Sequence, residues 1–288
     1  MKHVLVAVDL RAASDRAFGR AVQLAEAHGS ELTLLHVIDE QLLGYDDRMD
    51  RFEAQLRDRA ATKLARLWTG LPMLPSERFH KEIRTGTPWQ EILIAATQAS
   101  VDLVVLGLHQ SDALKDIFVG TTAERLIRHS PVPTLVVKDK PSGEYGKVIA
   151  ATDFSPCSSR ALLAALDLAP LANFDLLHIF DTPFSGFMRF SKPELEAFTK
   201  QRRDQAEKQI RRDLDMFLQT NATAAAPRVS LLCNRGEVVA GIASAVRKQK
   251  ADLLALGTHG RSTILGSILG SVAVTFLTEP PCDLLVAP

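Results

Sequence analysis

The segment Val4-Leu-Val-Ala-Val-Asp9 is an apolar run of strand length that ends at a carboxylate, and the second half of the chain repeats it as Val148-Ile-Ala-Ala-Thr-Asp153. Both copies are followed at the same spacing by Ser-x-Arg-Ala, beginning at Ser14 and Ser158. The other matching pairs, in chain order, are Leu35-His36-Val37 with Leu177-His178-Ile179, Gly86 with Gly236, Val101-Asp-Leu-Val-Val-Leu-Gly107 with Ala251-Asp-Leu-Leu-Ala-Leu-Gly257, and Gly120 with Gly270. Such a series indicates a duplicated domain.

The composition is that of an ordinary globular protein with two cores. The chain has 288 residues, of which 46% are hydrophobic and 24% charged, and its 34 Lys and Arg balance its 34 Asp and Glu. This balance argues against binding to nucleic acid or an anionic membrane through a global field. Three cysteines are too few for a disulfide framework, and no apolar run approaches the roughly 20 residues of a membrane span. We therefore expect a cytoplasmic protein.

Short apolar runs alternate with amphipathic stretches in each half, which is the pattern of βαβ units around a parallel sheet. The sequence predicts an α/β domain over residues 1–138, a polar linker over 139–146 and a second α/β domain over 147–288. Ser14 and Ser158 are the predicted helix N-caps. The predicted strands are 3–8, 32–38, 77–84, 102–107 and 133–137 in the first half, and 147–152, 174–180, 228–233, 252–257 and 283–287 in the second.

A glycine-rich loop follows the fourth predicted strand of the second half. It reads Gly257-Thr-His-Gly260-Arg261, then eight further residues, then Gly270-Ser271-Val272. We expect the early glycines to allow positive φ and close backbone approach, and Gly270 and Ser271 to open a helix whose free amides suit a phosphate. Arg261 would add a charged donor. Asp153, at the end of the first strand, would hold a ribose or base edge, or carry magnesium, and Ile179 would form an apolar wall.

These residues and the repeat resemble the universal stress protein family in its tandem two-domain form. The family's adenine-nucleotide motif, Gly-x2-Gly-x9-Gly-Ser/Thr, is matched in full by Gly257, Gly260, Gly270 and Ser271. The resemblance implies two doubly wound, Rossmann-like domains, each with a five-stranded parallel sheet of order 3-2-1-4-5. It also implies that the two halves pair through their last strands. The implied nucleotide-binding residues are Thr152, Asp153, Ile179, Gly257, His259, Gly260, Arg261, Gly270, Ser271 and Val272.

The first half departs from this motif, because Gln110 stands where the second glycine belongs. A glutamine forced to positive φ would be strained by on the order of 1 kcal/mol or more. The residues that still match are Asp9, Val37, Gly107, Gly120 and Thr121. The sequence therefore predicts a weak or empty first site.

The function indicated is an ATP-binding or other adenine-nucleotide-binding sensor or scaffold in a stress response, with or without magnesium. No catalytic residue and no metal-ligand cluster is indicated, and the P-loop lysine of fast NTPases is absent from the sequence. The alternatives are a slow nucleotide hydrolase, or an interaction protein that binds a partner or an apolar ligand through the Phe-rich segment 180–190. Whether two chains form a homodimer stays open.

Overall fold

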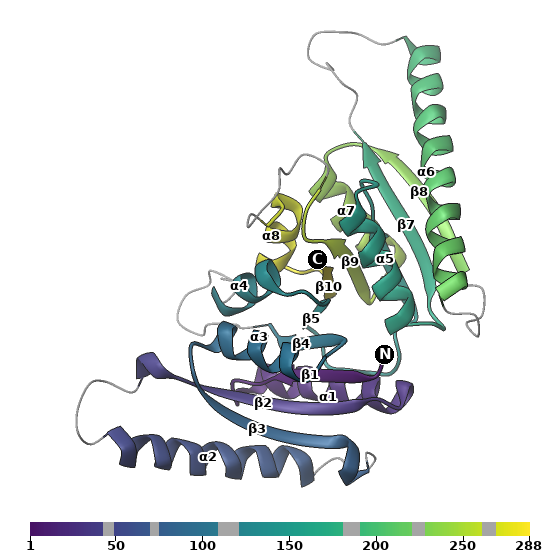
Figure 1. The fold of residues 1–288 in the computed structure, drawn as a ribbon. Helices are drawn as coiled ribbons and strands as arrows, with labels where there is room; N and C mark the ends of the chain where they lie inside the picture. The colour runs from purple at the N-terminus through teal and green to yellow at the C-terminus, as the bar shows by residue number, and fades with distance from the viewer. Residues whose placement is uncertain (43–48, 70–74, 109–120, 181–190, 221–227, 261–268) are drawn as a thin grey trace. The chain divides into compact units, whose positions relative to one another are not determined.

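The computed structural model describes residues 1–42, 49–69, 75–108, 121–180, 191–220, 228–260 and 269–288. Strands and helices alternate along the chain (Figure 1). The chain divides into two compact units. Unit 1 comprises Met1–Glu144 together with Leu277–Leu284, and unit 2 comprises Tyr145–Phe276 together with Leu285–Pro288. A segment from the end of the second repeat therefore packs with the first.

Unit 1 contains a parallel sheet of order β3-β2-β1-β4-β5, which confirms the order expected from the resemblance. Each strand begins and ends within two residues of its predicted range. The elements are β1 (His3–Ala7), α1 (Ala12–His28), β2 (Glu31–Asp39), η1 (Glu40–Leu42), α2 (Met49–Thr69), η2 (Ser76–Arg78), β3 (Phe79–Gly86), α3 (Pro88–Gln98), β4 (Leu103–Gly107), α4 (Thr121–His129) and β5 (Thr134–Val137).

Unit 2 repeats the arrangement, with parallel strands in the order β8-β7-β6-β9. The Thr258 amide, just after β9, donates to the Ala287 carbonyl at the end of β10 over 2.8 Å. The elements of the second repeat are β6 (Lys147–Ala151), α5 (Pro156–Leu168), β7 (Asn173–Phe180), α6 (Lys192–Thr220), β8 (Arg228–Arg235), α7 (Val238–Gln249), β9 (Leu253–Gly257), α8 (Ser271–Thr278) and β10 (Asp283–Ala287). The end of α8 and the start of β10 belong to unit 1. None of the described helices is long and apolar enough to cross a membrane.

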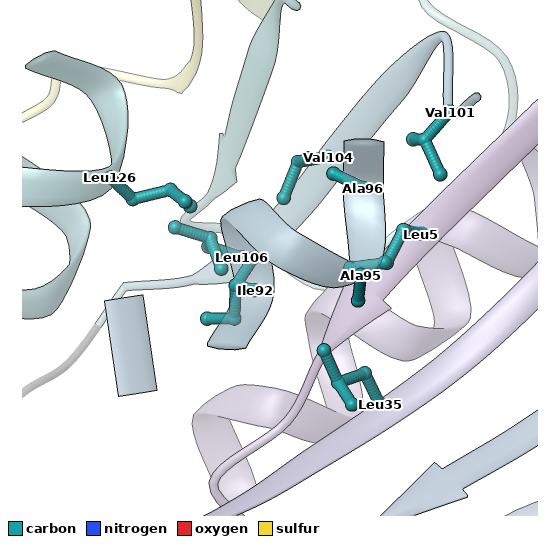
Figure 2. Close-up of a cluster of buried hydrophobic side chains, with 9 residues drawn as sticks. All are labelled: Leu5, Leu35, Ile92, Ala95, Ala96, Val101, Val104, Leu106 and Leu126. Carbon is teal, nitrogen blue, oxygen red and sulfur yellow. The ribbon is translucent and has the colours of Figure 1, made fainter. Parts of the chain in front are cut away.

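The strand register assigns side chains to the two faces of the first sheet. Leu5 pairs with Thr33 and Ala7 with Leu35, and since side chains alternate along a strand, all four point to one face. Helices α3 and α4 cover that face. Their side chains join those of β1, β2 and β4 in a buried cluster (Figure 2), which comprises Leu5, Leu35, Ile92, Ala95, Ala96, Val101, Val104, Leu106 and Leu126.

The opposite face is covered by α1 and α2. Phe79 pairs with Leu32, whose side chain points away from that of Leu35. The Phe79 ring stacks on Trp68 of α2 at 3.8 Å between centroids and contacts Phe18 of α1 at 6.4 Å. Two layers of helices therefore enclose the sheet and leave its strand ends as the accessible edge.

The predicted N-caps are wrong. The residue that caps α5 is Ser155, whose hydroxyl accepts from the Ser158 amide over 3.2 Å, and Ser158 lies inside the helix. The residue before α1 is Arg11, without a side-chain cap, and Ser14 lies inside that helix. The cause is a sharp turn at Leu10 and at Phe154, both at positive φ, which begins each helix earlier than the serine pattern suggests.

Asp283 anchors the segment Leu277–Leu284 in unit 1. Its carboxylate accepts from the Lys138 and Asp139 amides over 2.8 and 3.1 Å, and lies 3.5 Å from Nε of Arg20. The Asp283 side chain is 2% exposed and that of Arg20 is 7% exposed. The Lys138 ammonium also donates to the Pro280 carbonyl over 2.8 Å. Removing one partner of a buried charge pair lowers stability more than removing one partner of an exposed pair.

Replacing Asp283 by Asn should lower the free energy of unfolding by about 3 kcal/mol, because the buried Arg20 loses its countercharge. Chemical denaturation of the full chain measures this loss. Asp252→Asn is the matched control: Asp252 also accepts from two consecutive amides, those of Gly146 and Lys147, but this contact is exposed. Equal losses in the two variants would show that the buried charge contributes nothing.

Candidate functional site at the carboxyl ends of the strands

Asp153 lies in the sharp turn between β6 and α5. Its Oδ1 accepts from the Ser155 amide over 3.0 Å, and the intervening Phe154 has a φ of 64°. Thr152 fixes the same turn, because its Oγ1 accepts from the Phe154 amide over 3.0 Å and lies 3.1 Å from Oγ of Ser158. The turn thus orients the Asp153 carboxylate towards the edge of the sheet.

The described motif glycines pack closely at this end of the sheet. A Cβ placed on Gly260 would lie 2.8 Å from Oδ2 of Asp153. A Cβ on Gly257 would lie 2.8 Å from the backbone carbon of Cys157 and from the Ser158 amide nitrogen. The Gly270 amide donates to the Thr258 carbonyl over 2.8 Å, so the chain after the loop returns to the place where the loop begins.

The predicted positive φ is wrong for these glycines. The described glycines with positive φ are Gly29, Gly86, Gly143 and Gly236, and neither Gly257 nor Gly260 is among them. Their common property is close packing: Gly257 faces the backbone at the start of α5, and Gly260 faces the Asp153 side chain. Absence of a side chain is what these positions require.

Helix α8 begins directly after Gly270. The Gly270 carbonyl accepts from the Val274 amide over 3.0 Å, which is the first intrahelical bond, so the amides of Ser271 and Val272 lie in the first turn, where helices leave donors for other acceptors. Ser271 is exposed and Val272 half-buried. Arg261 lies outside the described residues.

Two further residues predicted for the second site, His259 and Ile179, lie at the carboxyl ends of β9 and β7, together with His178, which was not predicted. The His178 Nδ1 donates to the Thr152 carbonyl over 2.8 Å, which supports the Asp153 turn. His259 Nδ1 lies 2.9 Å from Oγ1 of Thr258, and the Ser155 hydroxyl donates to the His259 carbonyl over 3.3 Å. Ile179 is half-buried and packs on Gly241 of α7, where an added Cβ would meet the end of the Ile179 side chain.

The equivalent turn of unit 1 has a different set of polar contacts. The Asp9 amide donates to the Ser14 hydroxyl over 2.9 Å, and that hydroxyl donates to Oδ1 of Asp9. Oδ1 also accepts from the Arg11 amide over 3.0 Å, and Oδ2 lies 3.9 Å from Nε of Arg11. Asp9 is therefore held by its own turn. Gly120, Gln110 and the side chain of Thr121 lie outside the described residues.

A cavity of about 1050 Å³ lies at the carboxyl ends of β1, β2 and β4 in unit 1. Asp9, Val37 and Gly107, three of the predicted first-site residues, line it. Helix α2 lines it too, and the sequence reasoning missed this contribution. The signal was present as a stripe of cations at i, i+4 and i+7, namely Arg59, Lys63 and Arg66.

His36 lines the same cavity, and its Nδ1 donates to the Val8 carbonyl over 2.8 Å. Burial lowers the pKa of His36 below its usual value, while the bond to Val8 and the nearby Asp9 charge raise it and the Lys63 charge lowers it. Since the proton sits on Nδ1, the neutral ring keeps Nε2 as an acceptor. Among the described residues, no group of three or more His, Cys, Asp or Glu side chains could hold a metal ion.

The architecture is that of a tandem α/β protein of the doubly wound class, with its candidate sites at the carboxyl edges of parallel sheets. The model of the universal stress protein family matches residues 1–138 and again residues 144–288, and the chain belongs to this family.

Solved structures and curated sequences agree with this assignment. A universal stress protein from Archaeoglobus fulgidus has a TM-score of 0.64 at 17% identity, covering 99% of this chain and 97% of its own. One from Pseudomonas aeruginosa has a TM-score of 0.60 at 20% identity, covering 100% and 93%. These identities show a shared fold. A curated universal stress protein of Staphylococcus saprophyticus is 28% identical over 157 residues, which are 53% of this chain and 92% of that protein.

Gly257→Ala should lower the free energy of unfolding by about 1–3 kcal/mol, because its Cβ would meet backbone atoms that cannot move without shifting α5. Gly260→Ala is the matched control, since its Cβ would meet only the end of the Asp153 side chain, and we expect a loss within about 1 kcal/mol. Urea denaturation compares the two. A larger loss for Gly260→Ala would contradict the packing argument.

Acid should destabilise the protein through His36. Its pKa is lowered by burial in the folded state, so as pH falls below about 6.5 the unfolded chain takes up the proton first and stability is lost. His36→Asn retains a donor for the Val8 carbonyl but does not titrate. The difference in unfolding free energy between the two proteins, measured from pH 8 to pH 5, should therefore shift against the wild type at the acid end. A constant difference would disprove the effect.

Proposed function

We propose that unit 2 binds an adenine nucleotide, ATP with or without magnesium, and that the protein acts as a nucleotide-dependent sensor or scaffold in a stress response. The observation that carries this proposal is that Gly260 packs against Asp153 and Gly257 against the start of α5, while Gly270 returns to Thr258 beside them. Small residues at a strand end, close to a helix N-terminus, form an environment that favours an anion.

The parts of the nucleotide are assigned by chemistry. The amides of Ser271 and Val272, in the first turn of α8, would donate to phosphate oxygens, and Arg261 would add charge. Asp153 would bind a ribose hydroxyl, a base edge or magnesium, since a carboxylate repels phosphate. Thr152 and His259 shape the walls of the site, and Ile179 would contact the base with the part of its side chain that does not pack on α7.

For unit 1 we propose weak or no nucleotide binding. Asp9 is engaged by Ser14 and Arg11 within its own turn, and the sequence lacks the second motif glycine. We retain 1–138, 139–146 and 147–288 as proposed domain and linker boundaries. We also retain the pairing of the two repeats through their last strands as a proposal. The contacts of Asp283 with Lys138 and Asp139 support it, and the Asp283→Asn measurement tests those contacts.

Isothermal titration of the full chain with ATP and magnesium tests the nucleotide proposal. We expect one equivalent to bind. We expect Asp153→Ala to weaken binding about tenfold or more, through loss of a charge-assisted contact of about 1.5–3 kcal/mol. Asp9→Ala, the same change in the other repeat, should leave binding within about twofold. Gly260→Trp should abolish binding, because the new side chain would occupy the space beside Asp153.

The outcomes separate the alternatives. No heat with ATP, or an equal effect of the two Asp→Ala changes, would overturn the assignment to unit 2. Steady phosphate release that disappears in Asp153→Asn would identify a slow hydrolase instead of a sensor.

A further inference from the structure

The cavity of unit 1 has a wall chemistry that differs from a nucleotide cradle. Its apolar lining is aliphatic, and the described lining residues include no Phe, Tyr or Trp ring to stack on a base. Its volume of about 1050 Å³ lies at the upper end of the range of small-molecule sites. The aliphatic lining includes Ala7, Val37, Leu56, Ile92, Leu106 and Leu108.

Helix α2 gives this cavity a cationic rim. Arg59, Lys63 and Arg66 line it from positions i, i+4 and i+7, which share one face of a helix, and all three are exposed. Exposed cations beside an aliphatic interior keep their hydration until a ligand arrives, so they orient an anion and each adds modestly to its affinity.

The carboxylates around the cavity do not cancel this rim. Asp9 lies 3.9 Å from Nε of Arg11, which also lines the cavity. The described lining residues carry four cations, Arg11, Arg59, Lys63 and Arg66, against three carboxylates, Asp9, Asp39 and Asp58. On α2 itself, Asp58 is the one lining carboxylate beside three lining cations. The charge that a ligand meets along α2 is therefore positive.

We propose that the cavity of unit 1 binds an amphiphilic anion, a small molecule with an aliphatic body and one carboxylate-type head group. The body lies against the strand ends, where it removes apolar surface from water, and the head group lies at the rim among Arg59, Lys63 and Arg66. This site is separate from the nucleotide site proposed for unit 2, and the proposal does not depend on it.

Titration calorimetry of the full-length protein with dodecanoate, below its critical micelle concentration, tests the proposal. Dodecylamine and dodecanol, which have the same alkyl chain length, serve as comparison ligands. We expect one equivalent of dodecanoate to bind at least tenfold more tightly than dodecylamine. Three exposed cations, each contributing modestly, correspond to about tenfold in affinity.

Charge reversal provides the decisive variant. In R59E/K63E/R66E, which keeps good helix formers on an exposed face, dodecanoate should bind about tenfold more weakly and dodecylamine should become the preferred ligand. K200E/R203E/K208E, on exposed positions of α6 in unit 2, makes the same charge change and should leave dodecanoate binding unchanged. Circular dichroism verifies that each variant is folded.

A cavity-filling change checks the location independently of charge. Thr122→Phe, in the first turn of α4 where the side chain is half-buried and lines the cavity, should block dodecanoate. The proposal is overturned if dodecanoate does not bind, if dodecylamine binds as well, if the α2 variant behaves like the α6 variant, or if Thr122→Phe, once folded, binds dodecanoate as the wild type does.

Discussion

The placement of both candidate sites depends on one hydrogen bond, made twice. A histidine of the second strand donates from Nδ1 to the carbonyl at the end of the first strand, from His36 to Val8 and from His178 to Thr152, in both cases over 2.8 Å. The chain then turns at a residue with a φ near 60°, Leu10 or Phe154. This turn positions the aspartate and starts the helix, so the protein's own contacts arrange the polar groups at the edge of each sheet.

A single difference between the repeats redirects the aspartates. In unit 2 the Thr152 hydroxyl contacts Ser158, and Asp153 presents Oδ2 towards Gly260. In unit 1 the equivalent residue is Val8, which has no hydroxyl, and Ser14 instead bonds to Asp9. A buried or half-buried hydroxyl needs a partner, so removal of one hydroxyl transfers the bond to the carboxylate. The same backbone therefore presents two different chemical surfaces.

Sequence patterns predict best the features that depend on short stretches of chain. Strand positions were correct within two residues, because each apolar run is bounded by polar or turn residues. The strand order followed from the resemblance. The helix caps were wrong, because the chain turns with positive φ at Leu10 and Phe154, and neither residue type favours that conformation.

The glycine motif was recognised, but of the two physical reasons expected for it, positive φ was wrong and close approach agrees with the structure. A glycine can be needed for a positive φ or for lack of a side chain, and a sequence does not separate the two reasons. Here Gly257 leaves room for the backbone at the start of α5, which is an effect of tertiary packing. Sequence patterns do not predict the packing of Leu277–Leu284 with unit 1 either, because Asp283 and Arg20 become partners only once the sheets have formed.

Duplication separates the roles of scaffold and site in this chain. The core that must stay intact consists of strand residues and the helix faces packed on them, such as Leu5, Leu35 and Ile92. Residues on exposed helix faces and in the loops after strands carry little of that packing, so they can differ between repeats at small cost in stability. Arg59 and Lys63 in unit 1 and Gly260 in unit 2 occupy such positions. The two sites that we propose can therefore differ in ligand chemistry without any change in the sheet.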